Sequence, residues 1–128
     1  MLLRYEDYAA MRQHVASQAP LEACGLVAGR AGESRGTFPI ENILHSPSAY
    51  RMAPAEQVRA LTRMEANGET LLAIYHSHPN GKPQPSRRDV AEAAYDVVYL
   101  IWAPLGTTWV VRGFLLGESV REIAVRVV

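Results

Sequence analysis

The chain contains almost no cysteine, no excess of either charge and no long apolar run. Its single cysteine, Cys24, excludes an intrachain disulfide and a zinc cluster built from cysteines alone. Thirteen lysines and arginines balance thirteen aspartates and glutamates, so we expect no general electrostatic attraction to nucleic acid or to anionic lipid. No run approaches the roughly 18 apolar residues of a membrane span, and Glu6 and Asp7 stand where a signal peptide would be apolar. These absences predict a soluble, cytoplasmic protein that binds its partners through a local site.

What the sequence does contain is enough apolar residues for one sizeable core. The chain has 128 residues, of which 48% are hydrophobic, and it shows no internal repeat or linker, so we expect a single domain over residues 1–128. Apolar residues at helical spacing predict helices over residues 6–18, 54–66 and 86–95, with Val58, Leu61 and Met64 as the apolar positions of the second. Short apolar runs bounded by proline and glycine predict strands over residues 2–4, 22–29, 36–43, 70–78, 97–103, 107–116 and 120–128. Strands predominate, and helices are interspersed among them.

Two histidines stand at the end of the strand predicted over residues 70–78. Because side chains alternate along a strand, His76 and His78 project from one face with Cα atoms about 6.5 to 7 Å apart, a separation that one metal ion can bridge. Asp89 can supply a third ligand, and a catalytic zinc site keeps three protein ligands so that water fills the open position. Such a site still needs a base to collect the proton of that water. Glu22 is the candidate for this base.

Each of these residues also has an interpretation without function. A His-x-His pair on an apolar strand is often only a pair of hydrogen-bonded surface histidines. Ser86 and Asp89 have the spacing of a helix cap, in which the serine accepts a backbone N–H and the acidic residue supports the first turn. Glu22, close to Pro20, fits a solvated charge at a strand end. The residues by themselves leave these alternatives open.

The remaining polar residues carry weaker signals. We expect Cys24 to be a small buried hydrophobe rather than a nucleophile. His14 and His45 have no partner pattern and are expected to be structural or surface residues. Ser77 stays open between a residue that helps to fix the histidines and an exposed serine at a strand end.

Taken together, these residues form a pattern that is far more specific than any one of them. Glu22 is followed by His76-Ser77-His78-Pro79 and then by Asp89, with ten residues between His78 and Asp89 and with Ser86 three positions before Asp89. This order resembles the signature of the JAMM, or MPN-plus, zinc metalloprotease family. The sequence around Glu22 is similar to that of the short prokaryotic branch, and the resemblance covers nearly the whole chain.

The resemblance implies a fold and a site. The fold would be the cytidine-deaminase-like α/β MPN fold, a curved and mostly antiparallel sheet flanked by helices. Zinc would be held by His76, His78 and Asp89, with Glu22 as general base and then acid. Ser86 would donate a hydrogen bond to the oxyanion of the tetrahedral intermediate. No residue of the metal pattern is missing, so catalysis is expected, although two histidines and an aspartate also suit other divalent ions.

The resemblance also implies a substrate. We expect hydrolysis of the peptide or isopeptide bond at the C-terminal tail of a ubiquitin-like or sulfur-carrier protein, with the tail bound as an extended strand. The leaving group stays open between a lysine side chain and a single C-terminal residue such as cysteine. The chain leaves little room for the insertions by which eukaryotic relatives grip polyubiquitin, so polyubiquitin specificity is not expected.

Two other functions remain as alternatives. The segment from His76 to Asp89 is similar to the motif of RadC-type DNA-associated proteins, but the zero net charge disfavours a phosphate-tracking surface. A non-catalytic interaction module with a structural zinc would need a fourth protein ligand, which no motif supplies. The sequence does not indicate the oligomeric state, and a homodimer is compatible with it.

Overall fold

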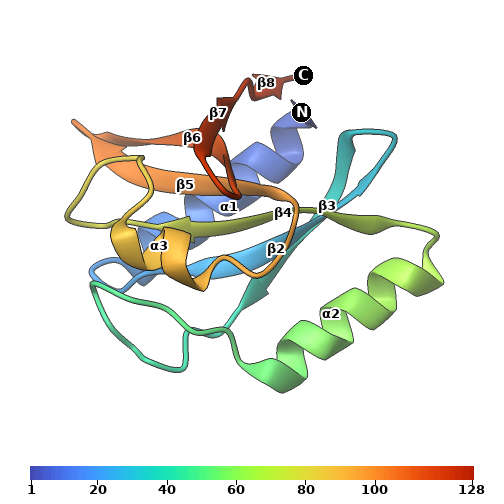
Figure 1. The fold of residues 1–128 in the computed structure, drawn as a ribbon, viewed down its shortest axis with the longest axis horizontal. Coiled ribbons are helices and arrows are strands. Elements are labelled where there is room, and N and C mark those ends of the chain that lie inside the picture. The colour runs from blue at the N-terminus through green and yellow to red at the C-terminus, as the bar shows by residue number, and fades with distance from the viewer.

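The computed structural model describes all 128 residues and arranges them as one curled sheet with helices on both sides (Figure 1). The elements in chain order are β1 (Leu2–Leu3), α1 (Tyr5–Gln18), β2 (Cys24–Arg30), β3 (Glu33–Ile40), α2 (Pro54–Ala66), β4 (Thr70–Ser77), α3 (Arg87–Glu92), β5 (Val98–Leu105), β6 (Thr108–Leu116), β7 (Val120–Ile123) and β8 (Arg126–Val127). The predicted α/β class, with a curved sheet flanked by helices, is confirmed.

Several predicted elements have other bounds in the structure, among them the strand predicted over residues 36–43, which is Glu33–Ile40. The third helix stops at Glu92, before the predicted end at residue 95. The backbone N–H groups of Ala94 and Tyr95 donate to the hydroxyl of Tyr99, both at 3.2 Å, instead of continuing the helix. The last predicted strand, over residues 120–128, is divided into β7 and β8, which pair with different strands.

The division of the last strand shows how strongly the sheet curls. The strand order is β7-β6-β5-β4-β2-β3-β1-β8, antiparallel except at the β4–β5 pair and at the short pairs that β1 forms with β3 and β8. β7 and β8 lie at opposite ends of this order, although only residues 124 and 125 separate them along the chain. The two edges of the sheet therefore approach each other, and the terminal ammonium of Met1 donates to the Ala124 carbonyl at 2.8 Å.

One face of the sheet is covered by α1. Met11 and Val15 on the helix and Tyr75 and Trp102 on the sheet are completely buried and belong to one apolar cluster. Tyr8 adds a tilted ring contact with Trp102, with the centroids 5.2 Å apart. None of the three helices combines the length and the hydropathy needed to cross a lipid bilayer.

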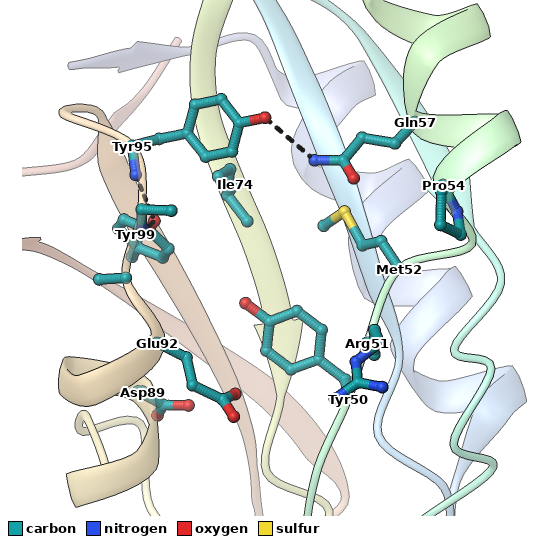
Figure 2. A pocket seen from close by; sticks show the side chains of 12 residues that line it. Tyr50, Arg51, Met52, Pro54, Gln57, Ile74, Asp89, Glu92, Tyr95 and Tyr99 are labelled. Carbon is teal, nitrogen blue, oxygen red and sulfur yellow. Dashed lines mark hydrogen bonds between the residues drawn. The ribbon is translucent and has the colours of Figure 1, made fainter.

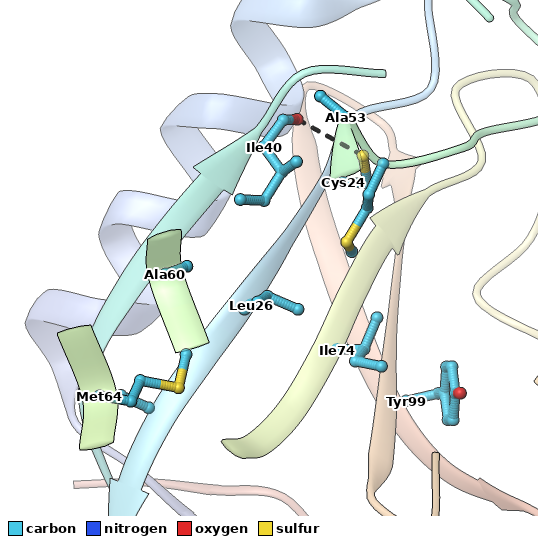
Figure 3. Close-up of a cluster of buried hydrophobic side chains, with 10 residues drawn as sticks. Cys24, Leu26, Ile40, Ala53, Ala60, Met64, Ile74 and Tyr99 are labelled. Carbon is cyan, nitrogen blue, oxygen red and sulfur yellow. Dashed lines mark hydrogen bonds between the residues drawn. The ribbon is translucent and has the colours of Figure 1, made fainter. Parts of the chain in front are cut away.

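The other face is covered by α2. Cys24 and Leu26 of β2 and Ile74 of β4 pack here with Ala60 and Met64 of the helix (Figure 3). The expected apolar stripe of α2 is only partly correct, because Val58 is 62% exposed and Ala60 takes its place against the sheet. This face is apolar beneath the helix and becomes polar where β4 ends.

Candidate metal centre

β4 changes from an apolar strand to a polar one as it ends. Its register with β2 pairs His76 with Cys24, and the Ser77 N–H donates to the Ala23 carbonyl at 3.1 Å. His76 is completely buried, and His78 is half-buried just beyond the strand. Because side chains alternate, both imidazoles project on the face that α2 covers.

Asp89 reaches the histidines from the first turn of α3. A capping box fixes this turn: Ser86 Oγ accepts the Asp89 N–H at 3.0 Å, and the Asp89 carboxylate accepts the Ser86 N–H at 2.9 Å. The same carboxylate faces both rings, with Oδ1 at 3.1 Å from His76 Nε2 and Oδ2 at 3.1 Å from His78 Nε2. Asp89 therefore supports the helix start and joins the histidines, so its two interpretations hold together.

The three side chains present acceptor atoms to one point. His78 Nδ1 lies 2.9 Å from the Lys82 carbonyl oxygen, which can only accept, so Nδ1 carries the proton and Nε2 keeps its lone pair in the neutral ring. The two Nε2 atoms are 3.1 Å apart, and the candidate ligand atoms all lie within 4.8 Å of one another. Donor atoms about 2.0 to 2.1 Å from a tetrahedral zinc are roughly 3.3 Å apart. The spacing therefore fits a cation of this size.

The pKa shifts of Asp89 and His76 favour the forms that bind a cation, whereas the shift of His78 favours its protonated form. Burial opposes the charge on Asp89, but its hydrogen bonds with the two imidazoles hold the pKa of this carboxyl far below its usual range. Burial also opposes protonation of His78, yet its bonds to Asp89 and to the Lys82 carbonyl raise its pKa. Burial lowers the pKa of His76 and so favours its neutral form. Neutral imidazole and ionised carboxylate are the donors that zinc takes in proteins.

The Nδ1 side of His76 is held by packing instead of a hydrogen bond. Its Nδ1 is buried and has no partner in the protein. The ring of Tyr50 stacks on the imidazole, with centroids 4.7 Å apart and planes inclined by 27°. The sequence does not single out Tyr50, because residues 50–53 show only a brief extended stretch before the proline that opens α2. An aromatic residue at that position was the one available signal.

Glu22 is buried beside this group. Continuing the β2–β4 register beyond the Cys24–His76 pair places Glu22 next to His78, and Glu22 is only 6% exposed. Burial raises the pKa of its carboxyl to about 7, with the charge of Asp89 adding to the rise and His78 opposing it. Glu22 is therefore not a solvated charge at a strand end. A carboxyl that titrates near neutrality is suited both to accept and to release a proton.

Asn42 organises the loop that holds Glu22 in place, and no sequence pattern singles out this residue. Its Nδ2 donates to the carbonyl oxygens of Glu22 and Ala49, both at 3.0 Å. Its Oδ1 accepts the N–H groups of Leu44 and Arg51, both at 3.1 Å. One buried amide thus uses all its hydrogen-bonding capacity to join the backbone of Glu22 to the segment that carries Tyr50.

Two small residues near the histidines have structural roles. Ser77 is completely buried, and its Oγ accepts the Ala23 N–H at 2.8 Å, so it ties the end of β4 to the start of β2. The alternative of an exposed strand-end serine is wrong. Cys24 is buried, its thiol lies 3.4 Å from the Ile40 carbonyl oxygen, and burial raises its pKa to about 12. It is a small core residue, as expected.

The other two histidines lie outside the metal centre, as expected. His14 on α1 is half-buried, with Nδ1 at 2.7 Å from the Tyr75 hydroxyl, and burial lowers its pKa. His45 is exposed and lies 3.3 Å from the carboxylate of Glu41.

A pocket of about 490 Å³ opens beside Asp89, between the start of α2 and the segment that follows α3 (Figure 2). Ile74 is one of its apolar lining residues. At the end far from Asp89, Gln57 Nε2 donates to the Tyr95 hydroxyl at 3.3 Å and joins the two walls. Tyr50 stands at the Asp89 end, so the pocket begins beside one candidate ligand and the ring that stacks on His76.

Comparison with known proteins agrees with this geometry. Residues 6–121 match the model of a family described as prokaryotic homologs of the JAB domain. The chain belongs to the prokaryotic JAB family. This membership confirms the resemblance to JAMM proteins that the order of Glu22, the two histidines and Asp89 indicates.

Relatives of this JAB-family protein include enzymes. One from Thermus thermophilus, a probable TtuB-protein conjugate cleaving protease, is 44% identical over 114 residues, which cover 88% of this chain and 73% of the relative. A desampylase from Haloferax volcanii is 34% identical over 120 residues, 91% of this chain and 85% of the relative. A JAB1/MPN domain protein from Archaeoglobus fulgidus superposes with a TM-score of 0.69 at 14% identity, covering 100% of this chain and 97% of that structure. This last likeness concerns the fold alone.

Proposed function

We propose that this protein is a zinc metallopeptidase that hydrolyses the peptide or isopeptide bond at the C-terminal tail of a ubiquitin-like or sulfur-carrier protein. One observation carries the proposal: the ligand atoms of His76, His78 and Asp89 lie within 4.8 Å of one another, beside a buried Glu22. Two relatives named as a conjugate cleaving protease and a desampylase support a conjugate as the substrate.

His76, His78 and Asp89 would hold the metal, and we propose zinc because this donor set suits it and the JAMM family uses it. Bound zinc supplies a Lewis acid and a water molecule of lowered pKa. No fourth protein ligand completes the group, since the thiol of Cys24 lies against the Ile40 carbonyl. An open position supports a catalytic role over a structural one.

Glu22 moves the proton. In its ionised form the carboxylate takes a proton from the attacking water, and in its protonated form it gives that proton to the leaving amine. A pKa near 7 serves both steps, because neither transfer is then strongly uphill at neutral pH. Asn42 keeps the carboxyl in place through the Glu22 backbone.

Ser86 stabilises the oxyanion. Its Oγ accepts the Asp89 N–H, so the hydroxyl proton is not used by the helix cap and is free to be donated. The residue is exposed and stands three positions from a metal ligand. A donor aimed at charge that develops only in the transition state typically contributes roughly a hundred- to a thousandfold in rate.

The carrier tail would enter through the pocket beside Asp89. This pocket is lined by Met52, Ile74 and Tyr99 and by one candidate ligand, Asp89. Its mixture of apolar walls and polar groups suits an extended peptide, in which side chains alternate between the walls and the opening. A reducing, cytoplasmic location agrees with the single buried cysteine.

The test is metal analysis of the purified protein together with cleavage of a ubiquitin-like fusion that carries a short C-terminal extension. We expect one zinc per chain and cleavage that a chelator abolishes. Glu22→Gln should retain the zinc and lose about a hundredfold or more in turnover, because the amide keeps the shape of the side chain and cannot take a proton. Full activity of Glu22→Gln would remove Glu22 as the base, and a protein without metal would refute the metallopeptidase.

A further inference from the structure

β3 has a partner along only one of its edges for most of its length. β1 reaches its outer edge at a single register position, Leu2 with Glu33. The other edge of β3 pairs with β2, which lies between β3 and β4. Just before β2, the carbonyl and the N–H of Ala23 both bond to Ser77 at the end of β4, so the main-chain groups of Ala23 point toward β4. Backbone groups alternate along an antiparallel strand, so up to the register shift after Val27 the odd-numbered residues of β2 bond to β4 and the even-numbered residues bond to β3.

This alternation fixes the direction of the β3 backbone groups. Leu26 pairs with Phe38 and Cys24 with Ile40, so the main-chain groups of Phe38 and Ile40 are used within the sheet. Those of Thr37 and of Pro39 point outward. No other strand of the sheet pairs with this part of the edge.

The next outward residue shows how such groups are used when a partner exists. The Glu41 N–H donates to the Glu56 carboxylate at 3.1 Å, and the Glu41 carbonyl accepts the Ala53 N–H at 3.0 Å. The start of α2 therefore covers the edge at Glu41. The start of α2 does not cover the N–H and carbonyl of Thr37 or the carbonyl of Pro39, so these groups are available to a partner strand.

A groove of about 530 Å³ runs between this open edge and α2. The strand contributes residues 37–40, and the helix contributes Arg59, Ala60 and Arg63, with Glu56 at the closed end. Both guanidinium groups are exposed and form no ion pair with the protein. The net charge of the chain is zero, so this pair is a local attraction for anions.

The spacing of the two arginines matches an extended chain. Residues four apart on a helix are separated by a rise of about 6 Å, and alternate residues of a strand by about 6.5 to 7 Å. A strand added to β3 would direct every second side chain toward α2, so two acidic side chains at alternate positions would meet Arg59 and Arg63 together. Main-chain bonds to an open edge supply affinity in such complexes, and the alternate side chains supply selectivity.

We propose that this groove binds an extended segment of a partner protein that has acidic residues at alternate positions, added to β3 as a new strand. The segment bonds through its main chain to Thr37 and Pro39, and through two carboxylates to Arg59 and Arg63. This site is distinct from the metal centre, and binding does not depend on the metal.

The test uses a labelled peptide in which three glutamates alternate with three valines, titrated by fluorescence anisotropy into the metal-free protein at low salt. The matched peptide has the same composition with its glutamates in one block. We expect saturable binding of the alternating peptide, at least about tenfold tighter than that of the block peptide. Binding should also slow hydrogen exchange of the Thr37 amide.

Two variants assign the binding to the groove. Arg59→Glu combined with Arg63→Glu should lower the affinity for the alternating peptide by about tenfold or more, and added salt should also lower this affinity. Arg121→Glu, which changes an exposed arginine of β7, is the matched control and should bind as the unchanged protein does. The proposal would be overturned by equal affinity of the protein for the two peptides or by the absence of saturable binding. It would also be overturned if the double variant bound the alternating peptide as tightly as the unchanged protein does.

Discussion

The two faces of the sheet are built from the same strands but end differently. On the α1 face, Tyr75 and Trp102 continue an apolar cluster that the 14-residue helix covers completely. On the α2 face the apolar cluster stops at Ile74, and His76 follows at the next position of the same side. The helix at this end of the face also differs from α1: α3 has six residues, and none of them is buried.

This difference shows where the fold leaves room for chemistry. The α1 face gains its stability from contact with a long helix. The α2 face has buried polar groups, a pocket beside Asp89 and a short helix whose start is held by its own cap. Buried polar groups are costly unless they are bonded, so the group formed by Glu22, Asn42 and His76 at one end of this face indicates a site kept for function.

The sharpest test of this comparison changes one histidine on each face. His78→Ala should lose the metal and all measurable hydrolysis, because it removes one of three ligands. His14→Ala on the α1 face should retain metal and activity, and it should lower the free energy of unfolding by about 1 to 3 kcal/mol, since the buried Tyr75 hydroxyl loses its partner. Metal content and urea unfolding check the two outcomes. Loss of metal in His14→Ala would break the comparison.

Most of the site could be predicted from sequence because it depends on short spacings. A two-residue interval on a strand puts His76 and His78 on one face, and a three-residue interval at a helix start links Ser86 to Asp89. Neither spacing needs knowledge of the tertiary fold. Asp89 as a third ligand and Glu22 as the base were candidates from their residue types alone, and only the family resemblance tied both of them to the two histidines.

The rest depends on contacts between distant segments. Tyr50 lies 26 positions from His76, and no periodicity reports that their rings stack. The early end of α3 depends on the hydroxyl of Tyr99, a tertiary hydrogen bond. The split of the last strand reflects the curl of the whole sheet. Val58 looked like a core residue because its spacing is helical, yet the position of α2 on the sheet decides which stripe is buried.

Substitution of Ser86, on the same face, should have a smaller effect than His78→Ala. Ser86→Ala should retain the metal and reduce turnover by about a hundredfold, because it removes the proposed oxyanion donor. It also removes the α3 cap, which costs about 1 kcal/mol. Ser86→Thr keeps both a hydroxyl and a cap, and we expect it to restore most of the turnover. If Ser86→Ala turns over at the normal rate, the hydroxyl serves only as a cap.

Tyr50 tests whether the α2 face holds His76 by packing. Tyr50→Ala should weaken metal binding by about tenfold, because the imidazole has neither a hydrogen bond on Nδ1 nor a ring to stack on. Tyr50→Phe keeps the ring and should bind metal normally. Titration with a chromophoric chelator measures both affinities. An affinity of Tyr50→Ala equal to that of the unchanged protein would show that burial alone orients His76.

The last test concerns the pH dependence of the stability of the metal-free protein. Burial raises the pKa of Glu22 in the folded state from an ordinary value of 4.5 to about 7, so between these values the folded protein holds a proton that the unfolded chain has released. Stability contributed by the protonated carboxyl is present below pH 4.5 and is lost as the pH rises through 7. Glu22→Gln has no such proton, and its advantage in free energy of unfolding over the unchanged protein should grow across this window and level off above it. Urea unfolding in the presence of chelator measures the difference at each pH. A difference that does not vary with pH would mean that Glu22 is solvated in the metal-free protein, and the α2 face would then be open to water as far as the base.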